Sequence, residues 1–185
     1  MPQPNHKHKI LYTEKRIEQR VKTLAQKINH DYQNKKPIVI ALLKGCIPFY
    51  TSLFLKLTCN PIMDFMVVSS YHGTKQQKTI KIVTDLRTNI RGRDIIIVDD
   101  IVDTGRTLTK LVKILKARGC KSLKVACLLL RSNNKGLIKP DYICFTTDHT
   151  KDEFIIGYGL DYLELYRNLP YIALMNSKAL EKSVK

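Results

Sequence analysis

The stretch from Asp94 to Thr107, which reads DIIIVDDIVDTGRT, carries the strongest indication of how this chain folds. It opens with a continuous apolar run, Ile95 to Val98, and such β-branched runs are typical of strands buried on both faces of a parallel sheet. The run passes directly into acidic residues and then into a Thr-Gly-Arg-Thr sequence. Because ligands of open α/β sheets bind beyond the carboxyl ends of the strands, the stretch predicts a binding site as well as a strand.

The polar half of this stretch combines groups that bind phosphate with groups that repel it. Gly105 lets the backbone approach a ligand closely, and Thr104 and Thr107 add hydroxyl donors just before a predicted helix. The carboxylates are those of Asp99, Asp100 and Asp103. Beside a phosphate they need another ligand, and ribose hydroxyls or Mg²⁺ fit their oxygens. Helix capping by Asp103 or Thr104 is the structural alternative, and it explains only part of the pattern.

Predicted strands and helices alternate along the rest of the chain. Strands are predicted at Ile38–Leu43, Ile62–Ser69, Asp94–Val98, Ser122–Leu130, Tyr142–Phe145 and Phe154–Ile156. Helices are predicted at Glu14–Tyr32 behind an N-cap at Thr13, at Pro48–Leu57, and around Leu108–Leu115 before Arg118-Gly119. A polar loop is expected from Tyr71 to Thr79. The alternation predicts one α/β domain with a mostly parallel sheet.

The composition limits the function classes. A chain of 185 residues with 44% hydrophobic residues fits one domain, 1–185. Its net charge of +16 fits a nucleic-acid binder, a phosphorylated substrate or a solvated surface, and the dispersed Lys and Arg residues favour the last. The apolar runs are too short for a membrane span, and no signal peptide is evident. Five scattered cysteines without a CxxC pair indicate reduced thiols and a cytoplasmic protein.

The stretch resembles the phosphoribosyl diphosphate motif of type I phosphoribosyltransferases, in particular their hypoxanthine-guanine branch. The resemblance extends from about Ile10 to Leu174. Its other landmarks are Leu43-Lys44-Gly45, Ser69-Ser70-Tyr71, Phe154 to Tyr162, and Tyr166 to Pro170. The resemblance implies the type I phosphoribosyltransferase fold: a twisted, mostly parallel sheet flanked by helices, with a core at about 35–150 and a small hood formed by the N-terminal and C-terminal segments.

The resemblance also implies a reaction, in which phosphoribosyl passes from 5-phosphoribosyl diphosphate to a purine nitrogen and pyrophosphate is released. It assigns Asp99 and Asp100 to the ribose hydroxyls and Asp103 to the general base. The 5′-phosphate loop consists of Thr104, Gly105, Arg106 and Thr107. Mg²⁺ is the implied cofactor, with Asp99, Asp100 and Asp161 as the residues near the metal.

Further residues are assigned to pyrophosphate and base by the same resemblance. Lys44 and Gly45 form the pyrophosphate loop, in which the peptide before the lysine is often cis, and Arg167 contacts pyrophosphate. Ser70 and Tyr71 begin a loop that closes over the reaction. Phe154 is the aromatic that stacks on the purine, and the backbone of Ile155 meets the ring edge.

The sequence departs from the family pattern at three places. Asp99 stands where the family has Glu, and the segment Thr146 to Glu153 is longer than expected. Arg131 aligns with the lysine that binds the six-position oxygen, and its planar fork differs from a point ammonium. A cationic donor there favours a 6-oxopurine, so we expect purine salvage with hypoxanthine or guanine, giving IMP or GMP, and xanthine as the alternative.

Two other function classes stay open from the sequence alone. A regulatory RNA-binding protein on the same fold would explain the positive charge, but those regulators carry tyrosine at the position of Asp103. A kinase or nucleotide hydrolase is the third possibility, and the chain lacks the Gly-x-x-x-x-Gly-Lys-Ser/Thr loop of its P-loop version. The expected partners are therefore 5-phosphoribosyl diphosphate and a 6-oxopurine, with no membrane or nucleic acid, in a homodimer or homotetramer.

Overall fold

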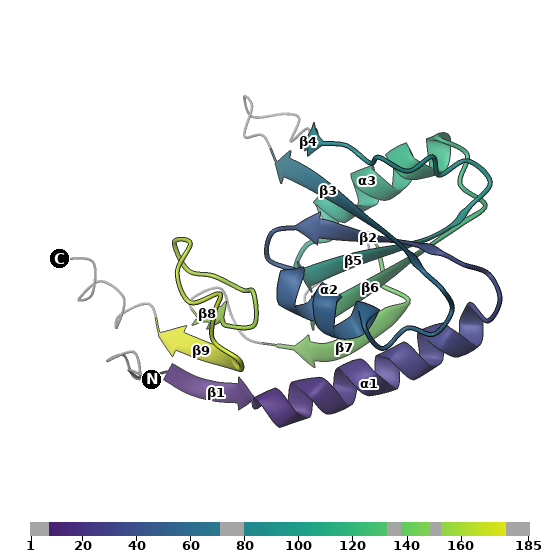
Figure 1. Ribbon diagram of the computed structural model, residues 1–185. Coiled ribbons are helices and arrows are strands. Elements are labelled where there is room, and N and C mark those ends of the chain that lie inside the picture. Colours follow the sequence, from purple (N-terminus) through teal and green to yellow (C-terminus); the bar gives the residue numbers. More distant parts are fainter. Residues whose placement is uncertain (1–7, 71–79, 133–137, 149–152, 177–185) are drawn as a thin grey trace.

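A twisted six-stranded sheet forms the centre of the computed structural model, which describes residues 8–70, 80–132, 138–148 and 153–176 (Figure 1). The strand order is β4-β3-β2-β5-β6-β7, and every pair is parallel except β3 with β4. The strands are β2 (Ile38–Leu43), β3 (Ile62–Ser70), β4 (Ile80–Thr84), β5 (Asp94–Val102), β6 (Ser122–Arg131) and β7 (Tyr142–Thr147). The predicted α/β fold with a mostly parallel sheet is thus confirmed.

Strand β5 lies inside the sheet, between β2 and β6. Its apolar run from Ile95 to Val98 is fully buried, as expected for a strand covered on both faces. The strand is longer than predicted, because its ladder with β6 continues beyond Val98 and pairs Asp99 with Cys127 and Val102 with Leu130. The acidic pair is therefore part of the strand rather than of the following loop, which fixes its backbone by hydrogen bonds.

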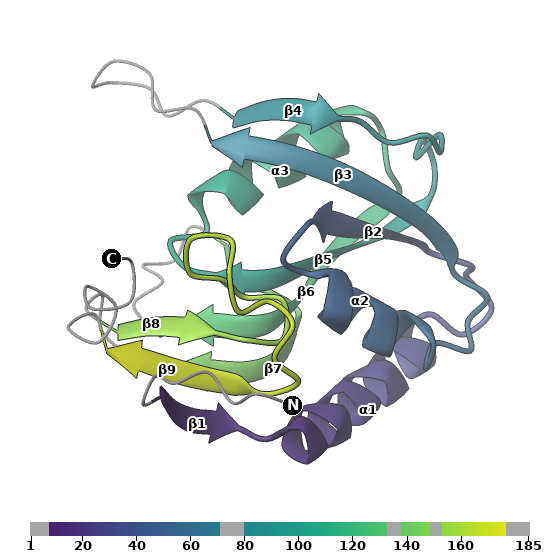
Figure 2. The same cartoon turned by 60° about the vertical axis from the view of Figure 1, so that its left-hand side comes forward.

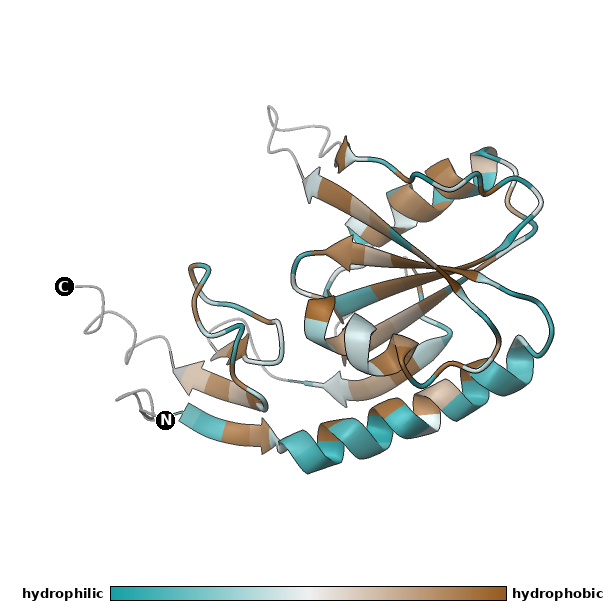
Figure 3. Ribbon diagram, in the orientation of Figure 1, coloured by the Kyte–Doolittle hydropathy of each residue, from teal (hydrophilic) through white to brown (hydrophobic). Residues whose placement is uncertain are grey.

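Helices cover both faces of the sheet and enclose two apolar cores. Helices α1 (Glu14–Asp31) and α2 (Ile47–Phe54) pack on one face, and α3 (Arg106–Ala117) packs on the other. Figure 3 shows the hydrophilic outer side of α1 and the apolar strands between the helices. The predicted N-cap is confirmed, since the Thr13 side chain accepts a bond from the Arg16 amide. In the described part of the chain no helix is long and apolar enough to cross a membrane.

The prediction for α2 was too long at its C-terminal end. The helix ends at Phe54 instead of Leu57, because the next amides turn back over three residues. The Lys56 amide bonds to the Leu53 carbonyl at 2.9 Å, and the Leu57 amide bonds to the Phe54 carbonyl at 3.1 Å. These bonds tighten the last turn and direct the chain toward β3.

A smaller antiparallel sheet lies beside the carboxyl-terminal edge of the large one (Figure 2). Its order is β1-β9-β8, so strands from the two ends of the chain are paired. The strands are β1 (His8–Tyr12), β8 (Glu153–Ile156) and β9 (Ile172–Asn176). Ile156, Ala173 and Met175 form a separate apolar cluster beneath it. Neither β1 nor β9 was predicted, and β4 at the edge of the large sheet was missed as well.

Candidate active site

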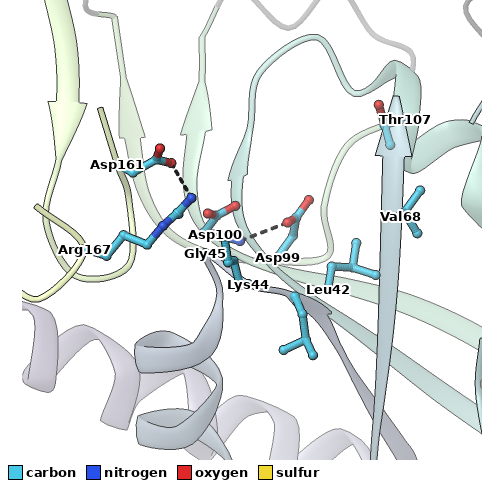
Figure 4. A pocket seen from close by; sticks show the side chains of 10 residues that line it. Leu42, Lys44, Gly45, Val68, Asp99, Asp100, Thr107, Asp161 and Arg167 are labelled. Atoms are coloured by element: carbon cyan, nitrogen blue, oxygen red, sulfur yellow. Dashed lines mark hydrogen bonds and ion pairs between the residues drawn. The ribbon is translucent and has the colours of Figure 1, made fainter. Parts of the chain in front are cut away.

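A cavity of about 360 Å³ opens where β2 and β5 end at the carboxyl edge of the sheet (Figure 4). It is lined by Leu42, Leu43, Lys44, Gly45, Val68, Asp99, Asp100, Thr107, Asp161 and Arg167. Most of these residues were predicted for ribose, pyrophosphate or metal, and they come from four separate parts of the sequence. Leu43 belongs to the predicted Leu43-Lys44-Gly45 landmark, whereas Leu42 and Val68 were not predicted, because apolar lining residues carry no chemical signal in a sequence.

A second cavity, of about 250 Å³, lies next to the first. It is lined by Asp99, Ile101, Val102, Asp103, Thr104, Gly105, Arg106, Thr107 and Leu108. Asp99 and Thr107 line both cavities, so the two spaces adjoin along these side chains. The predicted 5′-phosphate loop and the predicted general base thus face one cavity, while the predicted pyrophosphate residues face the other.

Two neighbouring carboxyl groups, those of Asp99 and Asp100, line the first cavity, and Asp99 also lines the second. Asp99 Oδ1 accepts a bond from the Asp100 amide at 3.1 Å, and Asp100 Oδ1 accepts one from the Ile101 amide at 2.8 Å. Burial and the adjacent Asp100 charge raise the pKa of Asp99 well above its ordinary value. Burial also raises the pKa of Asp100, although the Arg167 charge opposes that shift. Two carboxylates held this close favour a ligand that supplies hydroxyl donors or positive charge.

The start of α3 is suited to an anion. Gly105 is the N-cap and has a φ of 67°, a left-handed conformation that favours glycine. It has no side chain that could bond the first amides of the helix, so the first-turn amides other than that of Arg106 stay open to a ligand in the second cavity. The Arg106 amide approaches the Thr104 hydroxyl at 3.5 Å, which bends the loop toward the helix.

The loop after β2 packs closely against a turn that follows β8. The peptide bond between Leu43 and Lys44 is cis, as the family resemblance implied. A Cβ atom added at Gly45 would collide with the Asp100 carboxyl group, and one added at Gly159 would collide with the Gly45 carbonyl. Only glycine allows both approaches, so the two segments lie in direct backbone contact next to the acidic pair.

Arg167 connects this turn to the cavity. Its NH1 donates to the Gly159 carbonyl at 2.8 Å, and its NH2 lies 2.8 Å from Asp161 Oδ1. NH2 also lies 3.3 Å from Glu164 Oε2, which in turn lies 2.6 Å from Lys44 Nζ. Lys44 and Arg167 thus line one cavity and share the Glu164 carboxylate. Glu164 was not predicted, because it lies between the two landmarks that contain Asp161 and Arg167.

The residues predicted for the purine lie farther out and line neither cavity. Arg131 ends β6, and its Nε lies 3.5 Å from Asp103 Oδ1 at the second cavity. Phe154 is 37% exposed on β8 and meets the Tyr162 ring edge-on at 4.7 Å between centroids. The neighbouring Ile155 side chain is buried in the core.

Two predicted features fall at the limits of the described chain. Ser70 is the last residue of β3, and Tyr71 with the predicted loop lies outside the described residues. Part of the Thr146 to Glu153 segment lies outside them as well. Among the residues that are described, no three His, Cys, Asp or Glu side chains converge as a metal cage requires. The Asp161 carboxylate faces Arg167 instead.

Comparison with known proteins identifies the family. Residues 8–163 match the model of the phosphoribosyl transferase domain. The chain is 44% identical, over 94% of its length and 96% of the relative, to a hypoxanthine-guanine phosphoribosyltransferase of Streptococcus pyogenes. A Staphylococcus aureus hypoxanthine phosphoribosyltransferase structure matches with a TM-score of 0.85 and 37% identity, covering 92% of each chain. The Trypanosoma cruzi hypoxanthine phosphoribosyl transferase matches with a TM-score of 0.88 and 33% identity, covering 98% of each. The chain belongs to the phosphoribosyltransferase family.

Proposed function

We propose that this protein transfers the phosphoribosyl group of 5-phosphoribosyl diphosphate to hypoxanthine or guanine, forming IMP or GMP and pyrophosphate in purine salvage. The observation that carries the proposal is the pair of adjoining cavities, which share Asp99 and Thr107. One offers the N-terminal end of α3 to a phosphate, and the other offers Lys44 and Arg167 to a second anionic group. A sugar that carries a phosphate at one end and a diphosphate at the other spans this arrangement.

The sugar donor would bind across both cavities. The 5′-phosphate lies in the second cavity, on the amides and hydroxyls of Thr104 to Thr107. The ribose hydroxyls donate to the Asp99 and Asp100 carboxylates, which line the first cavity. The pyrophosphate lies in the first cavity, against Lys44 and Arg167.

Mg²⁺ fits this site as a partner of the substrate. Asp99 and Asp100 supply hard oxygen ligands, and Mg²⁺ keeps most of its waters while it bridges to phosphates. The described residues hold no three-residue metal cage, so the remaining ligands would be water and substrate oxygens. The bound ion would neutralise the leaving pyrophosphate. Asp161 would act near a second ion once Arg167 turns toward pyrophosphate.

The chemical step exchanges one bond at the anomeric carbon for another. The bond to the pyrophosphate oxygen breaks with its electron pair, and a nitrogen of the purine's five-membered ring bonds to the carbon. The ring proton passes to Asp103, which lines the second cavity. Positioning of the two reactants supplies much of the rate, because the reacting atoms must meet in line.

The purine would lie between the large sheet and the small one. Phe154 on β8 stacks on the ring, and the Ile155 backbone meets its edge. Arg131 donates to the six-position oxygen, which favours a 6-oxopurine over adenine. Ser70 and Tyr71 begin the loop that closes over the reaction, and the small sheet serves as the hood above it.

Two further properties belong to the same proposal. Each of the five cysteines is free, and four are buried, which suits a protein of the reducing cytoplasm. We also expect a homodimer or homotetramer, by analogy with the family.

A pyrophosphate-release assay tests the proposed function. The protein is incubated with 5-phosphoribosyl diphosphate, Mg²⁺ and hypoxanthine, guanine, xanthine, adenine or uracil in turn. We expect release with hypoxanthine and guanine, little with the other bases, and none when EDTA removes the metal. Adenine as the best substrate would contradict the role of Arg131, and release with no base at all would contradict transfer to a purine.

A further inference from the structure

The Glu164 carboxylate contacts both of the cationic side chains that line the first cavity, Lys44 and Arg167. Its Oε2 lies 2.6 Å from Lys44 Nζ and 3.3 Å from Arg167 NH2. Lys44 follows β2 and Arg167 lies between β8 and β9, so one carboxylate joins cations from two distant segments. These are the cations to which the proposed function assigns pyrophosphate. A single carboxylate therefore lies where a more highly charged anion is expected to bind.

The backbone conformation at Glu164 is one that glutamate seldom adopts, which points to a role for its side chain. Tyr162 and Leu165 pair as the ends of a tight turn, and the central residues Leu163 and Glu164 have φ values of 51° and 68°. Left-handed conformations at both central positions define a type I′ turn, for which Asn and Gly are preferred. Glutamate is disfavoured there by its Cβ. The turn thus carries a residue that local conformation does not favour.

Asp161 sets the direction of this side chain. Its Oδ2 accepts a bond from the Glu164 amide at 2.9 Å, while its Oδ1 lies 2.8 Å from Arg167 NH2. Asp161 therefore fixes the turn and the guanidinium at the same time. Glu164 then reaches back over the same guanidinium to Lys44.

We propose that Glu164 is a placeholder for pyrophosphate. In the free enzyme its carboxylate keeps Lys44 and Arg167 together, although they are like charges, and the arriving diphosphate displaces it. Glu164 is thus a positioning residue that acts through these two cations and competes with the ligand. The competition weakens pyrophosphate binding and so hastens release of the product. The inference rests on the proposed function, which assigns the two cations to pyrophosphate.

The ion pair between Lys44 and Glu164 is exposed to solvent, as expected for a contact that a ligand displaces. The Lys44 and Glu164 side chains are 61% and 63% exposed, so water screens the pair. Exposed ion pairs of this kind are weak, and a diphosphate carrying several negative charges can replace one carboxylate. Since Glu164 lies on the turn between Tyr162 and Leu165, its side chain can swing outward while the arriving diphosphate takes over its contacts with the two cations.

The test measures binding of inorganic pyrophosphate with Mg²⁺ by calorimetry to the full-length wild type and to two variants. Glu164→Gln keeps the size of the side chain, and Glu164→Gly suits the left-handed backbone. Both remove the competing charge, and we expect both to bind pyrophosphate about three- to tenfold more tightly at low salt. The gain should shrink as salt rises, because screening weakens the contact that was removed. Glu18→Gln, an exposed change on α1, is the matched control and should leave binding unchanged.

Steady-state kinetics give a second measurement on the same variants. The KM for 5-phosphoribosyl diphosphate should fall while the KM for the purine stays unchanged. A merely structural role for Glu164 would weaken pyrophosphate binding, so unchanged or weaker binding in both variants overturns the inference. If the wild type turns over 5-phosphoribosyl diphosphate and binds pyrophosphate, such a result leaves the proposed function intact. If the wild type does neither, the proposed function fails and the inference fails with it.

Discussion

The Nε of Arg131 lies 3.5 Å from Oδ1 of Asp103, so the residue proposed to recognise the purine touches the residue proposed to take its proton. Arg131 is 19% exposed and ends β6, whereas Asp103 is 64% exposed in the loop before α3. The guanidinium has further donors beyond Nε. One residue can therefore hold the carboxylate and still present a donor to the purine oxygen, which a single ammonium does less well.

The first prediction concerns Arg131. Arg131→Ala removes a charged donor to the purine oxygen, and we expect the KM for hypoxanthine to rise about tenfold or more. Arg131→Lys keeps the charge but loses the planar guanidinium, so its KM for hypoxanthine should lie between those of the wild type and the alanine variant. Steady-state kinetics with the purine varied at saturating sugar donor check this. An unchanged KM in Arg131→Ala would show that the purine does not contact this side chain.

The second prediction concerns Asp103. Asp103→Asn cannot accept the ring proton, and we expect the chemical step to slow by about a hundredfold or more. Binding of 5-phosphoribosyl diphosphate should be largely retained, because the phosphate loop and the acidic pair are unchanged. Single-turnover rates and calorimetry separate the two effects. A near-normal single-turnover rate would remove Asp103 from the role of general base.

The third prediction concerns the acidic pair. Asp99→Asn removes one of two adjacent, partly buried charges, so we expect the substrate-free protein to gain about 1 kcal/mol, or roughly 2–4 °C in Tm. Activity should fall sharply in the same variant, because the ribose ligand is lost. Differential scanning calorimetry checks the stability, and Glu18→Gln, an exposed change on α1, is the control.

The stabilisation by Asp99→Asn should depend on pH, because the pKa of Asp99 is raised in the folded protein. Since the pKa of Asp99 is raised in the folded protein, folding is not penalised below the ordinary carboxyl pKa, where the group is protonated in both states. The penalty grows as the pH rises from the ordinary carboxyl pKa toward the raised folded-state pKa, and it is complete above the latter. The stabilisation by Asp99→Asn should therefore be present at neutral pH and vanish in acid. A variant that is less stable than the wild type at neutral pH would contradict this account of the pair.

The fourth prediction concerns Asp64, a buried residue of β3. Its Oδ2 accepts from the Thr88 amide at 2.8 Å, and its Oδ1 accepts from the Phe65 amide at 2.8 Å. Asp64→Ala leaves these amides without their acceptor and should cost about 2–3 kcal/mol of unfolding free energy. Urea unfolding measures this. Asp85→Ala, which removes an exposed pair with Arg118, should cost less than about 1 kcal/mol.

The Asp64 contribution should also depend on pH. Burial alone would raise the pKa of this carboxyl, but bonds from Thr88, Phe65 and Arg87 outweigh burial and hold the pKa below its usual value. A depressed pKa gives stability that is present above the unfolded pKa and is lost as the pH falls through the folded one. The difference between wild type and Asp64→Ala should therefore narrow in acid. A difference that stays constant down to about pH 2 would argue against the carboxylate as its source.

The strands predicted correctly were those whose signal is local. The apolar runs of β2 and β5 are continuous, and Thr13 caps α1 through its own side chain. The strands β1 and β9 were missed because each depends on the other, with His8 paired to Met175 across nearly the whole chain. The five residues of β1 carry no local pattern that could indicate a partner strand so far away in the sequence.

The site was predictable only in part for a similar reason. Asp99 to Thr107 could be interpreted as a phosphate and ribose site, because all of its groups lie within one strand, loop and helix start. The first cavity also requires Lys44 and Arg167, which reach it from other elements. The contact of Glu164 with Lys44 was not predicted, because a turn on another segment creates it.

Identification of the nucleotide products shows whether the Asp99–Thr107 site transfers phosphoribosyl to a 6-oxopurine. The protein is given 5-phosphoribosyl diphosphate, Mg²⁺ and an equimolar mixture of hypoxanthine, guanine, xanthine and adenine, and the nucleotides formed are identified by mass spectrometry. We expect IMP and GMP as the main products, with Asp103→Asn forming them far more slowly. AMP as the main product, or no nucleotide at all, would contradict it.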